Sequence, residues 1–387
     1  MTAEFQAVFF LLQKIIGAFK ISAEVLTLKR VYNFNPGPAT LPLEVLQEAQ
    51  AEFLNFGDSG MSILEISHRA KPYEKVHNQA KADILELMGL DDDYEVLFIQ
   101  GGASLQFAMI PLNFATKENP GSYAVTGTFA KNAYKEAENL GVAQLAASTE
   151  AENFRRVPSQ AELNIAQNTA YFHICNNNTI FGTEYHYVPE TGVVPLFADM
   201  SSDMLSRPWD FKKYSLIYAG VQKNLGPAGV VIVVVKKSLV EKSLPTLPTM
   251  LRYDTFYKKN SLYNTPPAFS IYMVGKVVAW IKAQGGLAEM AKRNARKAEI
   301  LYAAIDESEG FYTGHAEKSS RSLMNVTFRL PNEELEKKFV AEALENNLSG
   351  VKGHRSVGGM RASIYNAMPI EGAEALAAFM KKFRRNA

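Results

Sequence analysis

The sequence predicts an α/β protein, with a large domain built on a mostly parallel sheet covered by helices and a smaller α+β domain after it. Three observations favour this architecture. At 387 residues the chain is longer than a single simple core needs. Short apolar runs typical of buried strands alternate with helical patterns, which indicates parallel strands with helices on both faces. From about Gly286 this alternation gives way to a different order of elements.

The large domain is expected over residues 42–285. Pro42 is suited to the start of a helix that runs to about Phe56, because proline is tolerated in the first turn. Further helices are expected over 72–89, 104–112, 130–140 and 267–284. Strands are expected over 95–100, 123–126, 170–175, 193–198, 215–219 and 230–235. In a sheet of this kind, ligands bind at the carboxyl ends of the strands.

The smaller domain is expected to combine residues 31–41 with 286–387. Its helices are predicted over 286–307, 332–347 and 370–385, with Pro331 at the start of the second. Its strands are predicted over 323–330 and 360–365. Residues 1–30 are interpreted as an N-terminal extension of unknown role. A targeting role is the alternative, but the apolar patch Ala7–Leu12 is preceded by an acid and by no basic residue, unlike a secretory signal.

Composition excludes several function classes. The chain has 41 basic and 40 acidic residues, so its net charge of +1 gives no general attraction to nucleic acid or anionic membranes. No apolar run has the length of a membrane span. The single cysteine, Cys175, allows neither a disulfide framework nor a cysteine zinc site, and we interpret it as a buried strand residue. We therefore expect a cytoplasmic protein that binds no metal, nucleic acid or membrane.

Lys223 is the candidate nucleophile. It follows the apolar run 215–219 and precedes Gly226, Pro227 and Gly229 in a turn before the next predicted strand. An amine held in a partly apolar turn at a strand end can lose its proton and act as a nucleophile. The alternative is a loop lysine beside a hairpin, since turn chemistry alone explains the glycines and the proline.

Two further features belong with this lysine. The segment 101–104, Gly-Gly-Ala-Ser, lies between a predicted strand and a helix, where backbone N–H groups and the helix dipole favour a phosphate. Asp199 ends a strand 24 positions before Lys223. A carboxylate for a pyridinium nitrogen and a lysine for a Schiff base are what pyridoxal phosphate requires. Asp199 could instead be a simple turn or N-cap residue.

Basic residues also gather in two irregular segments, Ser67–Arg69 and Gly353–Arg355, with Arg361 soon after the second. Arginine binds carboxylates and phosphates through two parallel hydrogen bonds, whereas surface ion pairing is the structural alternative. Together with the phosphate cup, Asp199 and Lys223, these cations predict a pyridoxal phosphate enzyme that acts on a diacidic or phosphorylated amino acid.

Long motifs of this sequence resemble the phosphoserine aminotransferases, which are class V, fold-type I pyridoxal phosphate enzymes. The motifs are NFNPGPATLP, EISHR, FIQGGASLQF, ADMSSDMLSRP, IYAGVQKNLGPAG, YNTPP and KGHRSVGGMRASIYNAMP. The resemblance runs from about Val31 to the C-terminus and leaves out residues 1–30. It implies a homodimer whose active sites are shared between the subunits.

The resemblance also implies a role for each matching position. Lys223 would form the Schiff base and Asp199 would bind the pyridinium nitrogen, as the catalytic pair. Thr179 would lie beside the O3′ side of the cofactor. The cofactor phosphate would be bound by Ala103, Ser104 and Gln222, with Asn264 and Thr265 from the neighbouring subunit. The substrate would be bound by His68, Arg69, His354, Arg355 and Arg361, with Arg361 on the α-carboxylate.

Two positions depart from the common pattern of the family. Phe129 stands where many members stack a tryptophan on the cofactor ring, and phenylalanine stacks too but lacks the indole N–H. Ser104 stands where some members have arginine, which leaves the substrate phosphate more dependent on Arg69, His354 and Arg355.

The resemblance implies transfer of the amino group of glutamate to 3-phosphohydroxypyruvate, which gives phosphoserine and 2-oxoglutarate in serine biosynthesis. The family also transaminates the phosphorylated hydroxythreonine precursor of vitamin B6, and this stays open as a second activity. Four rivals fit the residues less well. Cys175 lies too far upstream for a cysteine desulfurase, and an alanine–glyoxylate type of transaminase would not need so many cations. A nicotinamide dehydrogenase lacks its GxGxxG here, and an idle cofactor-binding protein would not need both Lys223 and Asp199.

Overall fold

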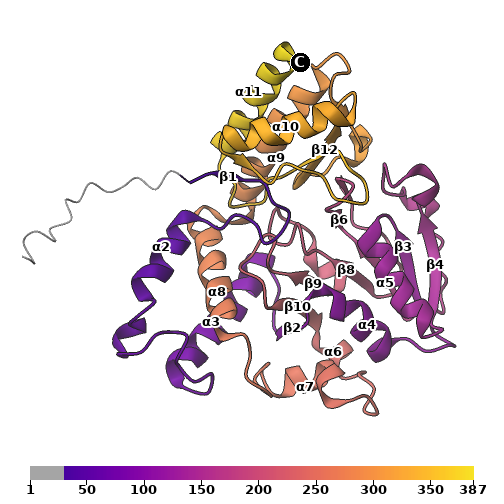
Figure 1. Cartoon of the computed structure of the whole chain (residues 1–387). Helices are drawn as coiled ribbons and strands as arrows, with labels where there is room; N and C mark the ends of the chain where they lie inside the picture. The colour runs from indigo at the N-terminus through magenta and orange to yellow at the C-terminus, as the bar shows by residue number, and fades with distance from the viewer. Residues whose placement is uncertain (1–29) are drawn as a thin grey trace, which may run out of the picture. The chain divides into compact units, whose positions relative to one another are not determined.

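The computed structural model describes residues 30–387. Its centre is a seven-stranded sheet with the strand order β2-β10-β9-β8-β5-β3-β4 (Figure 1). The strands are β2 (Tyr94–Ile99), β3 (Gly121–Val125), β4 (Ala143–Ser148), β5 (Tyr171–Cys175), β8 (Leu196–Asp199), β9 (Tyr214–Gly220) and β10 (Val231–Lys236). β10 runs antiparallel to both of its neighbours, and the other adjacent pairs are parallel. The predicted mostly parallel sheet is therefore confirmed.

Both faces of this sheet are buried, as the continuous apolar run of β10 requires. Val96 and Phe98 belong to the core on one face, while Leu97 and Ile99 belong to the core on the other. The first face is covered by α2 (Leu43–Glu52), α3 (Lys71–Met88) and α8 (Ala268–Ala283). The second face is covered by α4 (Gly102–Phe114), α5 (Thr128–Asn139) and α7 (Tyr253–Lys258).

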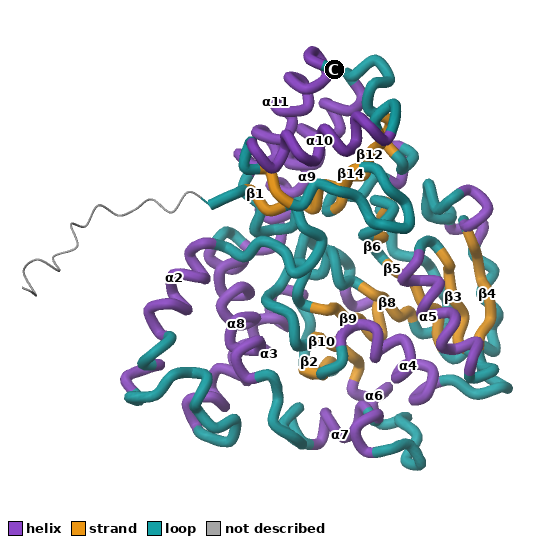
Figure 2. The backbone as a smooth tube through the Cα atoms, in the orientation of Figure 1, coloured by secondary structure: helices purple, strands orange, loops and turns teal. Residues whose placement is uncertain are grey.

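The C-terminal elements form a separate layer, drawn in orange and yellow in Figure 1. Three long helices, α9 (Gly286–Asp306), α10 (Glu333–Glu345) and α11 (Ile370–Asn386), group with a three-stranded antiparallel sheet (Figure 2). That sheet has the order β11 (Thr313–Gly314), β12 (Asn325–Arg329) and β14 (Met360–Ser363). Phe339 contacts Phe328 and Phe383 edge to face. The Phe34 N–H donates to the carbonyl of Ser349.

The remaining strands and α-helix are short. They are β1 (Tyr32–Asn33), β6 (Asn177–Asn178), β7 (Thr183–Glu184), β13 (Leu348–Ser349) and α6 (Lys237–Val240). β6 and β7 pair with each other just beyond the end of β5. No helix among residues 30–387 is long and apolar enough to cross a membrane. The expected extension lies, except for Arg30, outside the described residues.

Some predicted boundaries were wrong. The first helix ends at Glu52 rather than near Phe56, and the strand predicted over 193–198 begins only at Leu196. The helix predicted to open at Pro331 begins at Glu333, because the Asn332 side chain accepts a hydrogen bond from the Leu335 N–H and caps it. The edge strand β4 was not predicted at all. Its sequence AQLAAS carries little of the β-branched and apolar signal that marks the buried strands.

Candidate active site

Lys223 lies in the turn that joins β9 to β10. The pair Gly220 and Val231 closes the ladder on either side of this turn, and the N–H groups of residues 225 and 226 both donate to the carbonyl of Val221. The Lys223 amine donates to the hydroxyl of Thr179 at 2.7 Å. It also lies 4.7 Å from the centre of the Phe129 ring. The local turn therefore brings the amine against residues that follow two other strands.

The surroundings of Lys223 favour its neutral form. Burial lowers the pKa of the Lys223 amine, and the nearby Arg361 guanidinium lowers that pKa further. The Asp199 carboxylate acts in the opposite direction and raises it. A lysine with a lowered pKa carries the free amine that nucleophilic attack and proton abstraction both require.

Asp199 is the last residue of β8 and pairs with Cys175 and Tyr218 on the neighbouring strands. Its side chain is 5% exposed and accepts a hydrogen bond from the Ser201 N–H at 2.9 Å. This is the turn contact that the structural alternative predicted. Burial raises the pKa of the Asp199 carboxyl, while the Lys223 amine lowers it. A cation at this carboxylate would offset the cost of burying its charge.

Arg361, on β14, contacts Thr179, the residue that also binds the Lys223 amine. One of its guanidinium nitrogens donates to the backbone carbonyl of Thr179 at 3.2 Å, so Thr179 contacts Arg361 through its backbone and Lys223 through its side chain. Arg361 is 5% exposed, and its Nε has no hydrogen-bond partner among the described residues. A buried guanidinium with a free N–H is suited to an anionic ligand.

Two helices begin at this edge of the sheet. Gly101 caps α4 with a φ of 91°, which places Ala103 and Ser104 in the first turn of that helix. Gly127 precedes α5 and lies against Asn178, since a Cβ at Gly127 would lie 2.5 Å from the Asn178 side-chain oxygen. The free N–H groups of two helix starts make this edge favourable for a phosphate.

Gln222, Asn264 and Thr265 form a less compact group. The carbonyl of Gln222 accepts from the Ala39 N–H at 2.9 Å. Gln100, which follows β2, accepts from Asn264 and donates to the carbonyl of Thr265, both at 3.1 Å. The Asn264 side-chain oxygen has no partner among the described residues, so it can accept a hydrogen bond from a ligand.

The other predicted substrate residues are not brought to Lys223 by any described contact. His68 and Arg69 lie in the loop before α3, where the Arg69 N–H donates to the Ser67 hydroxyl at 3.3 Å. The His354 ring lies 2.6 Å from the Ser356 hydroxyl, and burial together with Arg361 lowers the pKa of His354. Arg355 lines a surface pocket of about 470 Å³.

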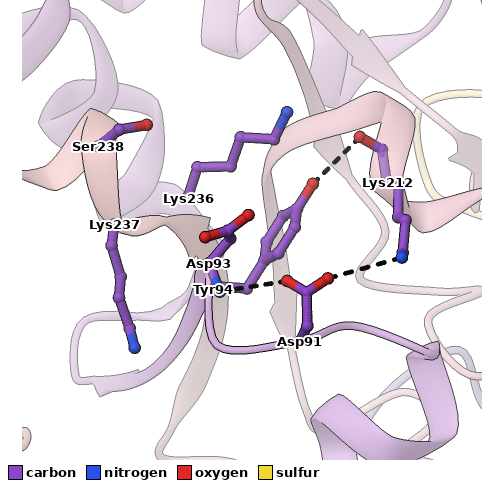
Figure 3. Close-up of a pocket in the computed structure, with 7 residues that line it drawn as sticks. All are labelled: Asp91, Asp93, Tyr94, Lys212, Lys236, Lys237 and Ser238. Carbon is purple, nitrogen blue, oxygen red and sulfur yellow. Dashed lines mark hydrogen bonds and ion pairs between the residues drawn. The ribbon is translucent and has the colours of Figure 1, made fainter.

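A second surface pocket, of about 360 Å³, lies at the opposite end of the sheet (Figure 3). Strand register places it there, because its residues Tyr94 and Lys236 pair at one end of β2 and β10 whereas Ile99 and Val231 pair at the end beside Lys223. Its Lys212 amine lies 3.6 Å from the Asp91 carboxylate, and both side chains are well exposed. Two acidic and three basic side chains line this pocket, and none of the predicted site residues is among them.

The residues present fit pyridoxal phosphate. A buried carboxylate in need of a cation suits a protonated ring nitrogen, and an amine with a lowered pKa suits the aldehyde carbon. Two helix starts suit the phosphate. Sequence reasoning missed Asn224, whose side chain accepts from the Asn366 N–H and donates to the carbonyl of Met204. The sequence feature that could have pointed to Asn224 is its position directly after Lys223.

Comparison with known proteins points the same way. A family model described as Aminotransferase class-V matches residues 31–376. A phosphoserine aminotransferase of Herpetosiphon aurantiacus is 56% identical over 353 residues, which is 91% of this chain and 98% of that protein. The solved phosphoserine aminotransferase of Bacillus circulans subsp. alkalophilus is 54% identical, with a TM-score of 0.91 and coverage of 92% of this chain and 99% of that one. The PLP-bound enzyme of Trichomonas vaginalis is 38% identical, with a TM-score of 0.86 over 91% of this chain and 100% of that one.

The fold and the site therefore define a pyridoxal phosphate-dependent aminotransferase of class V. Within that class, the chain belongs to the phosphoserine aminotransferase family, since it matches members over nine tenths of its length.

Proposed function

We propose that this enzyme transfers the amino group of glutamate to 3-phosphohydroxypyruvate, giving phosphoserine and 2-oxoglutarate in serine biosynthesis. The observation that carries the proposal is that the Lys223 amine and the buried Arg361 guanidinium both hydrogen-bond Thr179, while the buried Asp199 carboxylate acts electrostatically on Lys223. The names of relatives that the chain matches nearly end to end support the substrate. The phosphorylated hydroxythreonine precursor of vitamin B6 remains a predicted second acceptor.

Bound pyridoxal phosphate supplies an electron sink conjugated to the substrate Cα. Asp199 keeps a proton on the ring nitrogen, because the buried carboxylate is stabilised by a positive partner. Lys223 would accept the proton from the substrate Cα and return it to C4′ of the cofactor, and burial favours the free amine that this requires because it lowers the pKa of Lys223. The Thr179 hydroxyl orients that amine.

The remaining sequence-predicted roles complete this proposal. Arg361 binds the α-carboxylate, which glutamate and the phosphorylated acid share. Phe129 stacks on the cofactor ring. The cofactor phosphate is bound by Ala103, Ser104, Gln222 and, from the neighbouring subunit of a homodimer, Asn264 and Thr265. His68, Arg69, His354 and Arg355 bind the side-chain carboxylate or phosphate. The free oxygen of Asn264 supports a ligand beyond its own chain's contacts.

The same proposal divides the chain into a cofactor-binding domain over 42–285 and a smaller domain of 31–41 with 286–387, in a cytoplasmic enzyme. The separation of the seven-stranded and three-stranded sheets supports this division. The contact of the Phe34 carbonyl with the Ser363 N–H supports the assignment of the N-terminal loop to the smaller domain.

The role of Arg361 is tested by Arg361→Lys. Lysine keeps the charge but cannot bind a carboxylate through two parallel N–H groups, so KM for glutamate and for 3-phosphohydroxypyruvate should both rise, by roughly tenfold or more. Steady-state kinetics with each substrate varied gives the result. Arg296→Lys, on the exposed side of α9, is the matched control. An unchanged KM for both substrates would remove Arg361 from the substrate site.

The role of Thr179 is tested by Thr179→Val and Thr179→Ser. Valine has the same shape but no hydroxyl, so the Lys223 amine loses its acceptor and kcat should fall roughly tenfold. Serine keeps the hydroxyl and should retain most of the activity. Near wild-type activity in Thr179→Val together with a loss in Thr179→Ser would mean that the methyl group, and not the hydroxyl, is what the site requires.

A further inference from the structure

Lys297 is a fully buried lysine that the chemistry above does not use. It lies on α9, and its amine donates to the backbone carbonyls of Ile364 at 2.9 Å and Tyr365 at 2.6 Å. No acidic side chain pairs with it among residues 30–387. A buried lysine without a counter-ion is rare, because desolvating its charge is costly. Packing alone therefore does not explain why a lysine lies at position 297.

Its hydrogen bonds suit a neutral amine. Burial lowers the pKa of Lys297 to about 7, and Arg293 lowers it as well. Although α8, α11, β11 and β12 pack against α9, Arg293 is the one charged group in the described chain that shifts this pKa electrostatically. A neutral amine has two N–H groups, and the two carbonyls accept both of them.

The turn that Lys297 holds, residues 364–366, is joined to the catalytic turn. β14 ends just before it and carries Arg361. At the other end of the turn, the Asn366 N–H donates to the Asn224 side chain at 2.9 Å, and Asn224 follows Lys223. A second side chain of α9, Asn294, donates to the Asn366 side chain at 2.7 Å. α9 thus holds the turn through Lys297 and Asn294.

We propose that Lys297 is a positioning residue, which holds the 364–366 turn and thereby sets where Arg361 and Lys223 lie on the two sides of Thr179. It touches neither of them. Arg361 precedes the first held carbonyl by three residues, whereas Lys223 is reached only through Asn366 and Asn224. Loss of Lys297 should therefore displace Arg361 more than Lys223. This inference rests on the proposed role of Arg361 in binding the α-carboxylate.

The direct test replaces Lys297 with Met, which fills the same space without N–H groups. KM for both substrates should rise roughly tenfold while kcat stays within about threefold. Calorimetry should show a similar loss in the binding of glutarate, a dicarboxylate with no amino group, to the holoenzyme. Lys297→Gln, which keeps two N–H groups on a shorter side chain, should lie between wild type and Lys297→Met. Lys292→Met, exposed on the same helix, is the control.

A second readout uses the pH dependence of unfolding. The folded-state pKa of about 7 lies below the ordinary value of 10.5, so between these pH values only the unfolded chain holds the proton. This contribution to stability is full above pH 10.5 and is lost as the pH falls toward 7. As the pH rises from 7 to 10, the unfolding temperature of the wild-type holoenzyme should therefore increase relative to that of Lys297→Met. The difference in unfolding temperature between the wild type and Lys292→Met should stay constant over this range.

The Arg361 and Lys297 variants distinguish a failure of the proposed role of Lys297 from a failure of the proposed role of Arg361. If glutarate binding is unchanged in Arg361→Lys, the assignment of Arg361 fails, and the route through it fails as well. If Arg361→Lys weakens glutarate binding but Lys297→Met and Lys297→Gln do not, only the role of Lys297 is overturned. A fall in kcat with unchanged KM in both Lys297 variants would likewise show a merely structural lysine.

Discussion

Replacement of Lys223 by alanine should abolish amino transfer, with a loss of at least about ten-thousandfold in kcat. The side chain acts both as the nucleophile toward the cofactor and as the base and acid at the substrate Cα, so no second group replaces it. The amine contacts Thr179 and Phe129, and burial together with the Arg361 charge lowers its pKa and so favours the free amine. The variant should still bind pyridoxal phosphate through the other residues.

The measurement is kcat with glutamate and 3-phosphohydroxypyruvate, together with borohydride reduction of the holoenzyme and mass spectrometry. Wild type should retain the cofactor covalently on the peptide that contains Lys223, and the variant should not. Lys212→Ala, in the surface pocket at the far end of the sheet, is the matched control and should behave as wild type (Figure 3). Substantial turnover in Lys223→Ala, or attachment at another lysine, would contradict the assignment.

Asp199→Asn should lower kcat by about two to three orders of magnitude. Asparagine has nearly the same shape and can still accept from the Ser201 N–H, but it carries no charge to hold a proton on the ring nitrogen. Folding should be preserved, because burial of the carboxylate is itself unfavourable without a cation. KM for glutamate should change little, since Asp199 does not contact the substrate in this account.

The control for Asp199→Asn is Asp91→Asn, which removes an exposed carboxylate beside Lys212. Steady-state kinetics and thermal unfolding with and without added cofactor separate a catalytic loss from a folding defect. Asp199→Asn with wild-type kcat would mean that the ring nitrogen needs no buried carboxylate, and the electrostatic part of the mechanism would then be wrong.

Most of the fold could be predicted from the sequence because buried parallel strands leave a strong signal. The runs Leu216–Ala219 in β9 and Val231–Val235 in β10 are apolar throughout. Asp199 ends β8, and Lys223 closely follows the end of β9. β4 escaped prediction because an edge strand needs fewer apolar residues. Asn332 was overlooked as a cap because the preceding proline fits the start of a helix equally well.

The contacts of the site were harder to predict than its residues. Nothing in the local sequence of Arg361 shows that it meets the backbone of Thr179, because the contact joins segments 182 positions apart. The same holds for Lys297, which reads as one more lysine on a charged helix until the fold places its amine against Ile364 and Tyr365. Long-range backbone partners of this kind leave no periodic pattern in a sequence.

The most direct test of the central claim follows one nitrogen atom through both halves of the reaction. The holoenzyme is incubated with isotopically labelled glutamate, freed from small molecules, and then given unlabelled 3-phosphohydroxypyruvate. We expect 2-oxoglutarate to be released in the first step and labelled phosphoserine, about one per active site, to form in the second. Phosphoserine without the label, or no phosphoserine after a first step that releases 2-oxoglutarate, would contradict the central claim.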